Sequence, residues 1–132
     1  MTEQNDNSPD NRPSCLVIED DEEIREALSE TVSGVVKVRS VGDGLAAMEL
    51  LMAKRFDVIL CDINLPLISG PGILEEMMEK KIDTPVIFVS GALEPGIVKK
   101  VNDLGAFAVL EKPFPFRELI RLINEAIKKK SA

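Results

Sequence analysis

The chain has 132 residues, and its 16 Lys and Arg against 23 Asp and Glu give a formal charge of −7. Its length suits one domain with a substantial core, and its acidic balance argues against a nucleic-acid binder, which needs surplus cations to displace counterions from phosphates. The absence of His excludes Ser-His and Cys-His couples, imidazole metal ligands and a phosphohistidine of the chain's own.

Residues 1–13 are polar with two Pro, so they are predicted to form a flexible tail. One domain is expected over residues 14–130, followed by a short C-terminal tail at 131–132. Within the domain, a short apolar run followed by an amphipathic stretch occurs five times. The predicted strands are 16–18, 35–40, 56–61, 85–89 and 107–110, and the predicted helices are 24–32, 44–54, 71–78, 95–104 and 114–130.

This alternation predicts an α/β fold with a five-stranded parallel sheet and helices on both faces, the doubly wound, flavodoxin-like (βα)5 class. The run 35–40 alternates apolar with charged residues and therefore suits an edge strand or a strand with one buried face. Two helices are expected to carry apolar stripes on one side. The stripes are Leu45, Met48, Leu51 and Met52 in the second helix, and Ile73, Leu74, Met77 and Met78 in the third.

Cys15 and Cys61 lie in apolar runs and are interpreted as buried, reduced thiols, with a disulfide between them as the alternative. No apolar run is long enough to cross a membrane, which takes about 18 residues. The N-terminus lacks a basic-then-apolar export signal, so a cytoplasmic location is predicted.

Polar side chains follow four of the predicted strands: Glu19-Asp20-Asp21, Asp62, Ser90 and Lys112-Pro113. Each has an ordinary explanation as a helix cap, a turn residue or a solvated charge. In a parallel sheet, however, the carboxyl ends of the strands meet at one edge, where ligands bind. It is improbable that carboxylates, a hydroxyl and an ammonium converge at this edge by chance.

Clustered carboxylates repel one another and attract a hard divalent cation, and Mg²⁺ suits oxygen ligands. A carboxylate beside that cation can attack phosphorus and become an acyl phosphate. An ammonium and a hydroxyl then stabilise the phosphoryl oxygens. No general base is needed, because an ionised carboxylate is already a nucleophile.

The segments LVIEDDEEIR, VILCDINLPLISG, PVIFVSGA and GAFAVLEKPF occur in this order between residues 14 and 130. With these four segments in this order, the chain resembles the receiver domain of two-component response regulators. The resemblance implies that Asp62 accepts a phosphoryl group, while Ser90 and Lys112 contact it. It also implies a Mg²⁺ site and a cis peptide at Lys112-Pro113. The implied Mg²⁺ ligands are Asp62, Asp20, Glu19 through water, and the backbone carbonyl of Asn64, with Asp21 as a helix cap.

The resemblance further implies that a histidine kinase or histidine phosphotransfer protein donates the phosphoryl group. It implies that the aspartyl phosphate is hydrolysed on the domain. The signal then passes to a downstream protein or to an absent effector domain. It implies no membrane contact and no nucleic acid bound by this domain, and it allows a weak homodimer. The chain is then a phosphoacceptor rather than an enzyme in the usual sense, either a stand-alone regulator or a fragment of a longer one.

The sequence departs from the family pattern at the predicted output face. Val109 stands where many receivers carry an aromatic switch residue, and Phe107 is expected on the same strand face two residues earlier. Gly91 after Ser90 and Pro95-Gly96 in the fourth helix favour a loose segment. The loop and helix after Ser90 are therefore expected to carry the switch.

Three other functions remain as alternatives. A Mg²⁺-dependent phosphatase with an Asp nucleophile usually has a second Asp two positions on as general acid, but Asn64 stands there. A flavodoxin-like cofactor carrier needs a phosphate loop and stacking aromatics, and the chain has no Tyr or Trp. The third is a receiver-like interaction module that is not phosphorylated.

Overall fold

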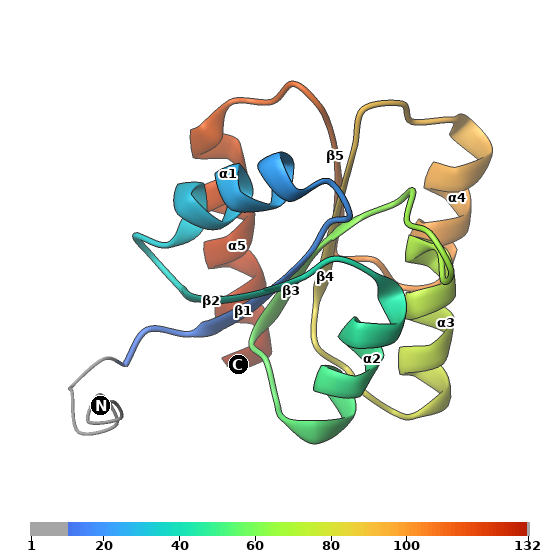
Figure 1. The fold of residues 1–132 in the computed structure, drawn as a ribbon, viewed down its shortest axis with the longest axis horizontal. Coiled ribbons are helices and arrows are strands. Elements are labelled where there is room, and N and C mark those ends of the chain that lie inside the picture. The colour runs from blue at the N-terminus through green and yellow to red at the C-terminus, as the bar shows by residue number, and fades with distance from the viewer. Residues whose placement is uncertain (1–10, 132) are drawn as a thin grey trace.

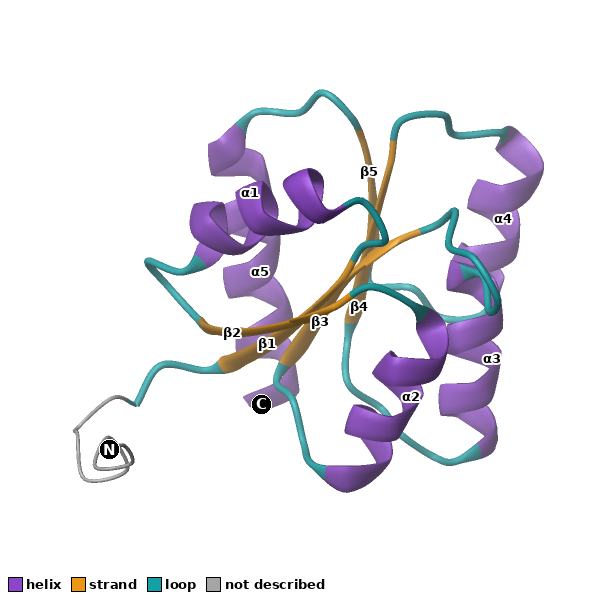
Figure 2. Cartoon of the chain, in the orientation of Figure 1, coloured by secondary structure: helices purple, strands orange, loops and turns teal. Residues whose placement is uncertain are grey.

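The short apolar runs form one fully parallel sheet in the computed structural model, which describes residues 11–131 (Figures 1 and 2). The strands lie in the order β2-β1-β3-β4-β5. All four neighbouring pairs are parallel, so the carboxyl ends of the strands share one edge. The strands are β1 (Ser14–Ile18), β2 (Lys37–Val41), β3 (Val58–Asp62), β4 (Val86–Ser90) and β5 (Ala108–Glu111).

The five helices within residues 11–131 cover the two faces of this sheet (Figure 1). One face is covered by α1 (Glu22–Val32) and α5 (Phe116–Ser131), and the other by α2 (Gly44–Ala53), α3 (Gly70–Glu79) and α4 (Pro95–Asp103). The predicted fold class is confirmed, and the predicted element boundaries differ from these by a few residues. No helix within residues 11–131 is long and apolar enough to cross a membrane.

Alternate residues of the central strands enter two separate hydrophobic cores, because successive side chains of a strand point to opposite faces. Phe88 and Ile59 pack on the α2–α4 side, and Ile87 and Val58 pack on the α1–α5 side. The edge strand β2 instead exposes its charged residues, as its alternation predicts. The central strands are thus covered on both faces and hold the strand ends rigidly.

The predicted apolar stripes of two helices are wrong at three positions. Leu45 and Met52 in α2 are 53% and 63% exposed, and Met78 in α3 is 54% exposed. The residues of α2 that reach the core are Gly44, Ala47, Met48 and Leu51. The stripe was misplaced because α2 is apolar around most of its circumference, so the sequence pattern does not mark which side faces the sheet.

Phe107 does not lie on the same face as Val109, which corrects a second expectation. Val109 packs against the core under α3 and α4, whereas Phe107 packs on the α1–α5 side. Phe107 precedes β5, and its N–H donates to the carbonyl of Val86 at 2.8 Å. The regular alternation of the strand begins after it, so a count of two residues does not place the two side chains together.

The predicted domain boundaries at residues 14 and 130 can be compared with the hydrogen bonds of residues 12 and 13 and with the end of the last helix. Residues 1–10 of the predicted tail lie outside the described residues. Arg12 donates to the carbonyl of Ser33, and the Pro13 carbonyl accepts from the N–H of Lys37 at 2.8 Å. At the other end, the last helix extends to Ser131.

The two cysteines are buried free thiols, as predicted. Burial raises the pKa of Cys15 to about 12, and burial together with the charge of Asp62 raises the pKa of Cys61 well above its usual value. Both thiols therefore stay protonated at neutral pH and react poorly.

Gly70 fixes the position of the chain just after β3. A Cβ atom there lies 2.9 Å from the Cα of Ile63, 2.9 Å from the ring of Phe88 and 3.0 Å from the carbonyl oxygen of Asp62. Because the nearest atoms are largely backbone, they cannot move away as a flexible side chain could. The start of α3 thus packs directly beneath the end of β3.

We predict that Gly70→Ala lowers the free energy of unfolding by about 1–3 kcal/mol, as overpacking does. Chemical denaturation measures this value. Gly96→Ala is the matched control, because a Cβ there meets nothing within 4 Å and alanine favours the helix. Equal stability of Gly70→Ala and the parent chain contradicts the role given to Gly70.

Candidate metal and phosphoryl-transfer site

The strand order places two acidic strand ends at the point where the chain reverses its direction of winding. From β1 the chain runs to β2 on one side of β1, and it then crosses over to β3 on the other side. The crevice outside such a pair of strand ends is the usual ligand site of doubly wound sheets. Glu19 and Asp20 follow β1 there, and Asp62 ends β3.

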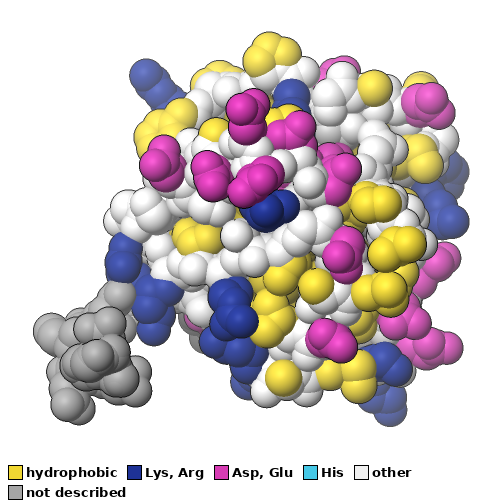
Figure 3. Space-filling view, viewed as in Figure 1, with side chains coloured by type: hydrophobic (Ala, Val, Ile, Leu, Met, Phe, Trp, Pro, Cys, Tyr) yellow, Lys and Arg dark blue, Asp and Glu magenta, His cyan; other side chains and the backbone are white. Residues whose placement is uncertain are grey.

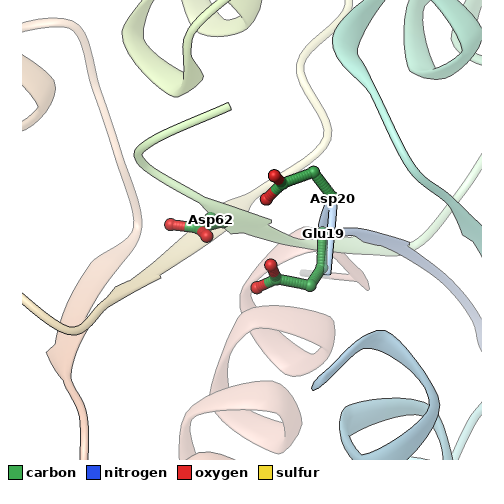
Figure 4. A group of neighbouring side chains, drawn as sticks. All are labelled: Glu19, Asp20 and Asp62. Carbon is green, nitrogen blue, oxygen red and sulfur yellow. The ribbon is translucent and has the colours of Figure 1, made fainter. Parts of the chain in front are cut away.

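Figure 4 shows these three carboxylates directed toward a common space. Each contributes an oxygen within 4.8 Å of the other two. Glu19 is buried, Asp62 is half-buried and Asp20 is exposed, so the group has a closed side and an open side. Among the described residues, no other group of three His, Cys, Asp or Glu side chains comes together in this way.

Glu19 is held in place from several directions. Its carboxylate accepts from the N–H of Asp21 at 3.1 Å and pairs with the ammonium of Lys112 at 3.4 Å. Its backbone carbonyl accepts from Arg25 at 2.9 Å. Burial raises the pKa of Glu19 above its usual value, and the charge of Asp62 raises it further. The hydrogen bond from the Asp21 N–H and the charge of Lys112 lower this pKa, but they do not cancel the increase. The negative form of Glu19 is thus under-stabilised, and a cation at this point relieves it.

Asp62 and Ser90 are connected through Asn64. The N–H of Asn64 donates to the Asp62 carboxylate at 3.0 Å, and its side-chain amide donates to the Ser90 hydroxyl at 3.3 Å. Ser90 is completely buried, and its hydroxyl also accepts from the N–H of Ala92 at 3.2 Å and donates to the Ala92 carbonyl at 3.3 Å. In this state the hydroxyl is therefore engaged within its own loop.

Lys112 reaches the site from the end of β5, and its N–H donates to the Ser90 carbonyl at 2.8 Å. In the described part of the chain, its ammonium makes an ion pair with Glu19 and none with Asp62. The Lys112–Pro113 peptide is cis. Asp21 caps α1 by accepting from the N–H of Ile24 at 3.0 Å and lies outside the carboxylate group. The predicted metal-binding, phosphoacceptor and phosphoryl-contacting residues thus lie at one edge. There Lys112 pairs with Glu19, and Ser90 bonds Ala92 and Asn64, so neither is paired with Asp62.

Three supporting residues have no strong signal in the sequence. Arg25 lies on a helix that looks solvated, yet it bonds the Glu19 carbonyl and approaches Gly42, where a Cβ lies 3.0 Å from its guanidinium. Gly70 is the first residue of α3 and packs under Asp62, directly after a loop that contains other turn residues. Their roles depend on segments distant in sequence, which no local pattern reveals.

The donor set fits a hard divalent cation. All three side chains offer carboxylate oxygens, which Mg²⁺ prefers, and the exposed position of Asp20 leaves room for water ligands. The raised pKa of the buried Glu19 indicates a charge that lacks full compensation in the protein alone. A carboxylate, a neighbouring ammonium and a hydroxyl at one edge are also the groups needed to take up a phosphoryl group.

The fold and the site therefore define a doubly wound α/β domain with an acidic strand-end site. Comparison with known families identifies it further. The family model of the response regulator receiver domain matches residues 15–124. The chain belongs to this family, the receiver domains of two-component response regulators.

Relatives with known names support this assignment. The chain is 32% identical to the transcriptional regulatory protein PdtaR of Mycobacterium tuberculosis over 114 residues, which are 85% of this chain and 55% of PdtaR. It is 34% identical to the transcriptional regulatory protein DltR of Streptococcus agalactiae over 112 residues, covering 83% of this chain and 49% of DltR. The chain thus spans about half the length of these relatives.

Solved receiver domains have the same fold. The signal receiver domain of the response regulator NarL from Mycobacterium tuberculosis superposes with a TM-score of 0.83 at 28% identity, covering 89% of this chain and 97% of that one. The receiver domain of the Francisella response regulator 1452 has a TM-score of 0.83 at 27% identity, covering 90% of this chain and 99% of that one.

We predict that Glu19→Gln raises the melting temperature in Mg²⁺-free buffer at neutral pH. The pKa of Glu19 is raised in the folded chain, so the folded state holds this proton more tightly than the unfolded state does. Stability contributed by Glu19 is therefore present at low pH and lost as the pH rises through the raised pKa. The difference between variant and parent should shrink as the pH falls toward the pKa of an unfolded Glu. A variant that melts below the parent at every pH contradicts this view of Glu19.

Proposed function

We propose that Asp62 accepts a phosphoryl group from a phosphohistidine of a partner histidine kinase or histidine phosphotransfer protein, in a site that holds Mg²⁺. The observation that carries this proposal is the junction of β1 and β3, where the carboxylates of Glu19, Asp20 and Asp62 converge. These 132 residues contain no His, so the donor imidazole lies outside them.

In the proposed transfer, a carboxylate oxygen of Asp62 forms a bond to phosphorus while the phosphorus–nitrogen bond of the donor breaks. The electron pair of that bond leaves with the imidazole nitrogen, which is protonated from solvent. Bound Mg²⁺ would supply positive charge beside the phosphoryl oxygens, held by Glu19, Asp20, Asp62 and the backbone carbonyl of Asn64. The Asp62 carboxylate needs no general base.

Two residues must then change partners. Lys112 now pairs with the buried Glu19 at 3.4 Å, and a cation bound to Glu19 frees the ammonium to pair with the new phosphoryl oxygens. The Ser90 hydroxyl exchanges the Ala92 carbonyl for a phosphoryl oxygen. Because Ala92 bonds this hydroxyl through both its N–H and its carbonyl, the loop after Ser90 moves with it. We propose this loop and α4 as the switch.

Two features support the switch at this segment rather than at β5. Val109 is packed against the core under α3 and α4 and has no aromatic ring to redirect, and Phe107 faces the other layer. In contrast, α4 has no side-chain cap bond and begins with Pro95. A weak homodimer through the face of α4 and α5 is a subordinate proposal.

The rival phosphatase function has less support. A general acid is needed to protonate the leaving group of an external phosphoester, and Asn64, two residues after Asp62, has an amide already donated to Ser90. We therefore propose a phosphoacceptor without turnover of external substrates, apart from hydrolysis of its own aspartyl phosphate. We place it in the cytoplasm and propose that it signals to a downstream protein or to an effector domain. It binds neither nucleic acid nor membrane itself.

We predict that incubation with acetyl phosphate and Mg²⁺ adds one phosphoryl group to the intact chain, detected by mass spectrometry. Asp62→Asn should lose the adduct, because the amide is not a nucleophile. Asp103→Asn is the matched control, because Asp103 lies on α4 and pairs with Lys99. A chain that gains no adduct under these conditions, or an Asp62→Asn variant that still gains it, refutes the proposal.

We predict that beryllofluoride, a phosphoryl mimic, speeds amide hydrogen exchange between Ser90 and Asn102. The Ala92 amide is the sharpest reporter, since its present acceptor is the Ser90 hydroxyl. Ser90→Ala should remove the response to the mimic, while amides in the centre of α1 report the unaffected fold. Exchange that changes elsewhere but not in this segment contradicts the proposed switch.

A further inference from the structure

The outward face of α2 is apolar where a surface helix is normally polar. Leu45 is 53% exposed and Met52 is 63% exposed, and Glu49 is exposed between them. These residues are spaced i, i+4 and i+7, so they form one stripe on the helix. The opposite side of α2 already fills the core with Met48 and Leu51. More than half of the surface of Leu45 and of Met52 is therefore left uncovered by this domain.

An exposed leucine in a strained turn extends the stripe. Leu67, in the loop between β3 and α3, is 76% exposed and has a φ of 71°. The N–H of Ile68 donates to the Pro66 carbonyl at 2.8 Å across it. This hydrogen bond and φ are those of a strained γ-turn, in which an L side chain is unfavourable. Neither stability nor solubility favours leucine here.

The turn lies against the start of α2. A Cβ on Gly44 lies 2.8 Å from the Cβ of Ile68, so the residue that follows Leu67 packs against the residue that precedes Leu45. Figure 3 shows hydrophobic side chains gathered over α2 and this loop. We call Leu45, Met52 and Leu67 the α2 patch.

A second copy of the chain does not suit this patch. Glu49 lies near its centre, so pairing α2 with α2 of another copy about a two-fold axis sets Glu49 against its own equivalent. Like charges facing one another are destabilising. Three side chains also offer far less than the roughly 800 Å² per partner of a stable protein–protein interface. The size and charge of the patch suit a short cationic segment instead.

We propose that the α2 patch binds an amphipathic helix of a partner protein in which a Lys or Arg lies between two apolar residues spaced i and i+7. The apolar residues would cover Leu45 and Met52, and the cation would pair with Glu49. Helix-in-groove recognition uses this spacing. The inference rests on the surface alone and holds whether or not Asp62 accepts a phosphoryl group.

The test uses two synthetic helical peptides, labelled with fluorescein and added to the full chain. One has leucines at i and i+7 with lysine at i+4, and its twin has glutamate in place of that lysine. Fluorescence anisotropy should show binding of the lysine peptide and at least tenfold weaker binding of the twin. Glu49→Lys should reverse this preference, and Leu45→Ser with Met52→Ser should weaken binding of the lysine peptide at least tenfold.

Matched controls separate the patch from general attraction to an acidic protein. Glu30→Lys on α1 changes the net charge as Glu49→Lys does, and Phe116→Ser removes an exposed apolar side chain elsewhere. Both should leave binding unchanged. Leu67→Gly should weaken binding without lowering the melting temperature, because glycine tolerates the positive φ.

The proposal is overturned if the lysine peptide does not bind, or if Glu30→Lys weakens binding as much as Glu49→Lys. It is also overturned if sedimentation shows that the parent chain dimerises and that Leu45→Ser with Met52→Ser abolishes the dimer. That result assigns the patch to a second copy of the chain.

Discussion

The carboxylate of Glu19, buried beside Asp62, is the constraint on which the site depends. Removing such a charge from water is unfavourable unless it is paired and hydrogen-bonded. The chain supplies the Asp21 N–H and the Lys112 ammonium to its carboxylate, yet the pKa of Glu19 remains raised. The domain thus holds an incompletely compensated negative charge, and this creates affinity for a cation at the edge of the sheet.

The parallel sheet holds the acidic side chains of the site in fixed positions. Three neighbouring strands, β1, β3 and β4, are buried on both faces, so their ends are fixed by packing on two sides. The order β2-β1-β3 places the ends of β1 and β3 next to each other although more than 40 residues separate Glu19 from Asp62. Gly70 then brings α3 close beneath Asp62. The core therefore fixes the positions of the site residues.

The clear alternation of strands and helices predicts that the strand-end residues lie close together, because parallel strand ends converge, and the structure brings these residues to one edge. That argument reaches Glu19, Asp20, Asp62, Ser90 and Lys112, but it cannot reveal that Lys112 pairs with Glu19, or that Ser90 bonds its own loop. Those pairings depend on distances between chain segments. It failed where local pattern is ambiguous: Phe107 lies before the regular pleat, and α2 has two apolar faces of which only one enters the core.

Under the proposed function, the hydrogen bonds and ion pairs of the site also set the size of the switch. The hydroxyl of Ser90 makes bonds of 3.2 and 3.3 Å with Ala92, at the long end for a hydroxyl. A charge-assisted bond to a phosphoryl oxygen is about twice as strong as a neutral one, so the exchange gains about 1–2 kcal/mol. Since 1.4 kcal/mol is a tenfold change in an equilibrium, this bond alone shifts the loop population by about one order of magnitude. The ammonium of Lys112, freed from Glu19 by a bound cation, adds to the same shift. In the proposed switch, cation binding and the release of Lys112 are therefore coupled through Glu19, although Ser90 ends β4 and Lys112 follows β5.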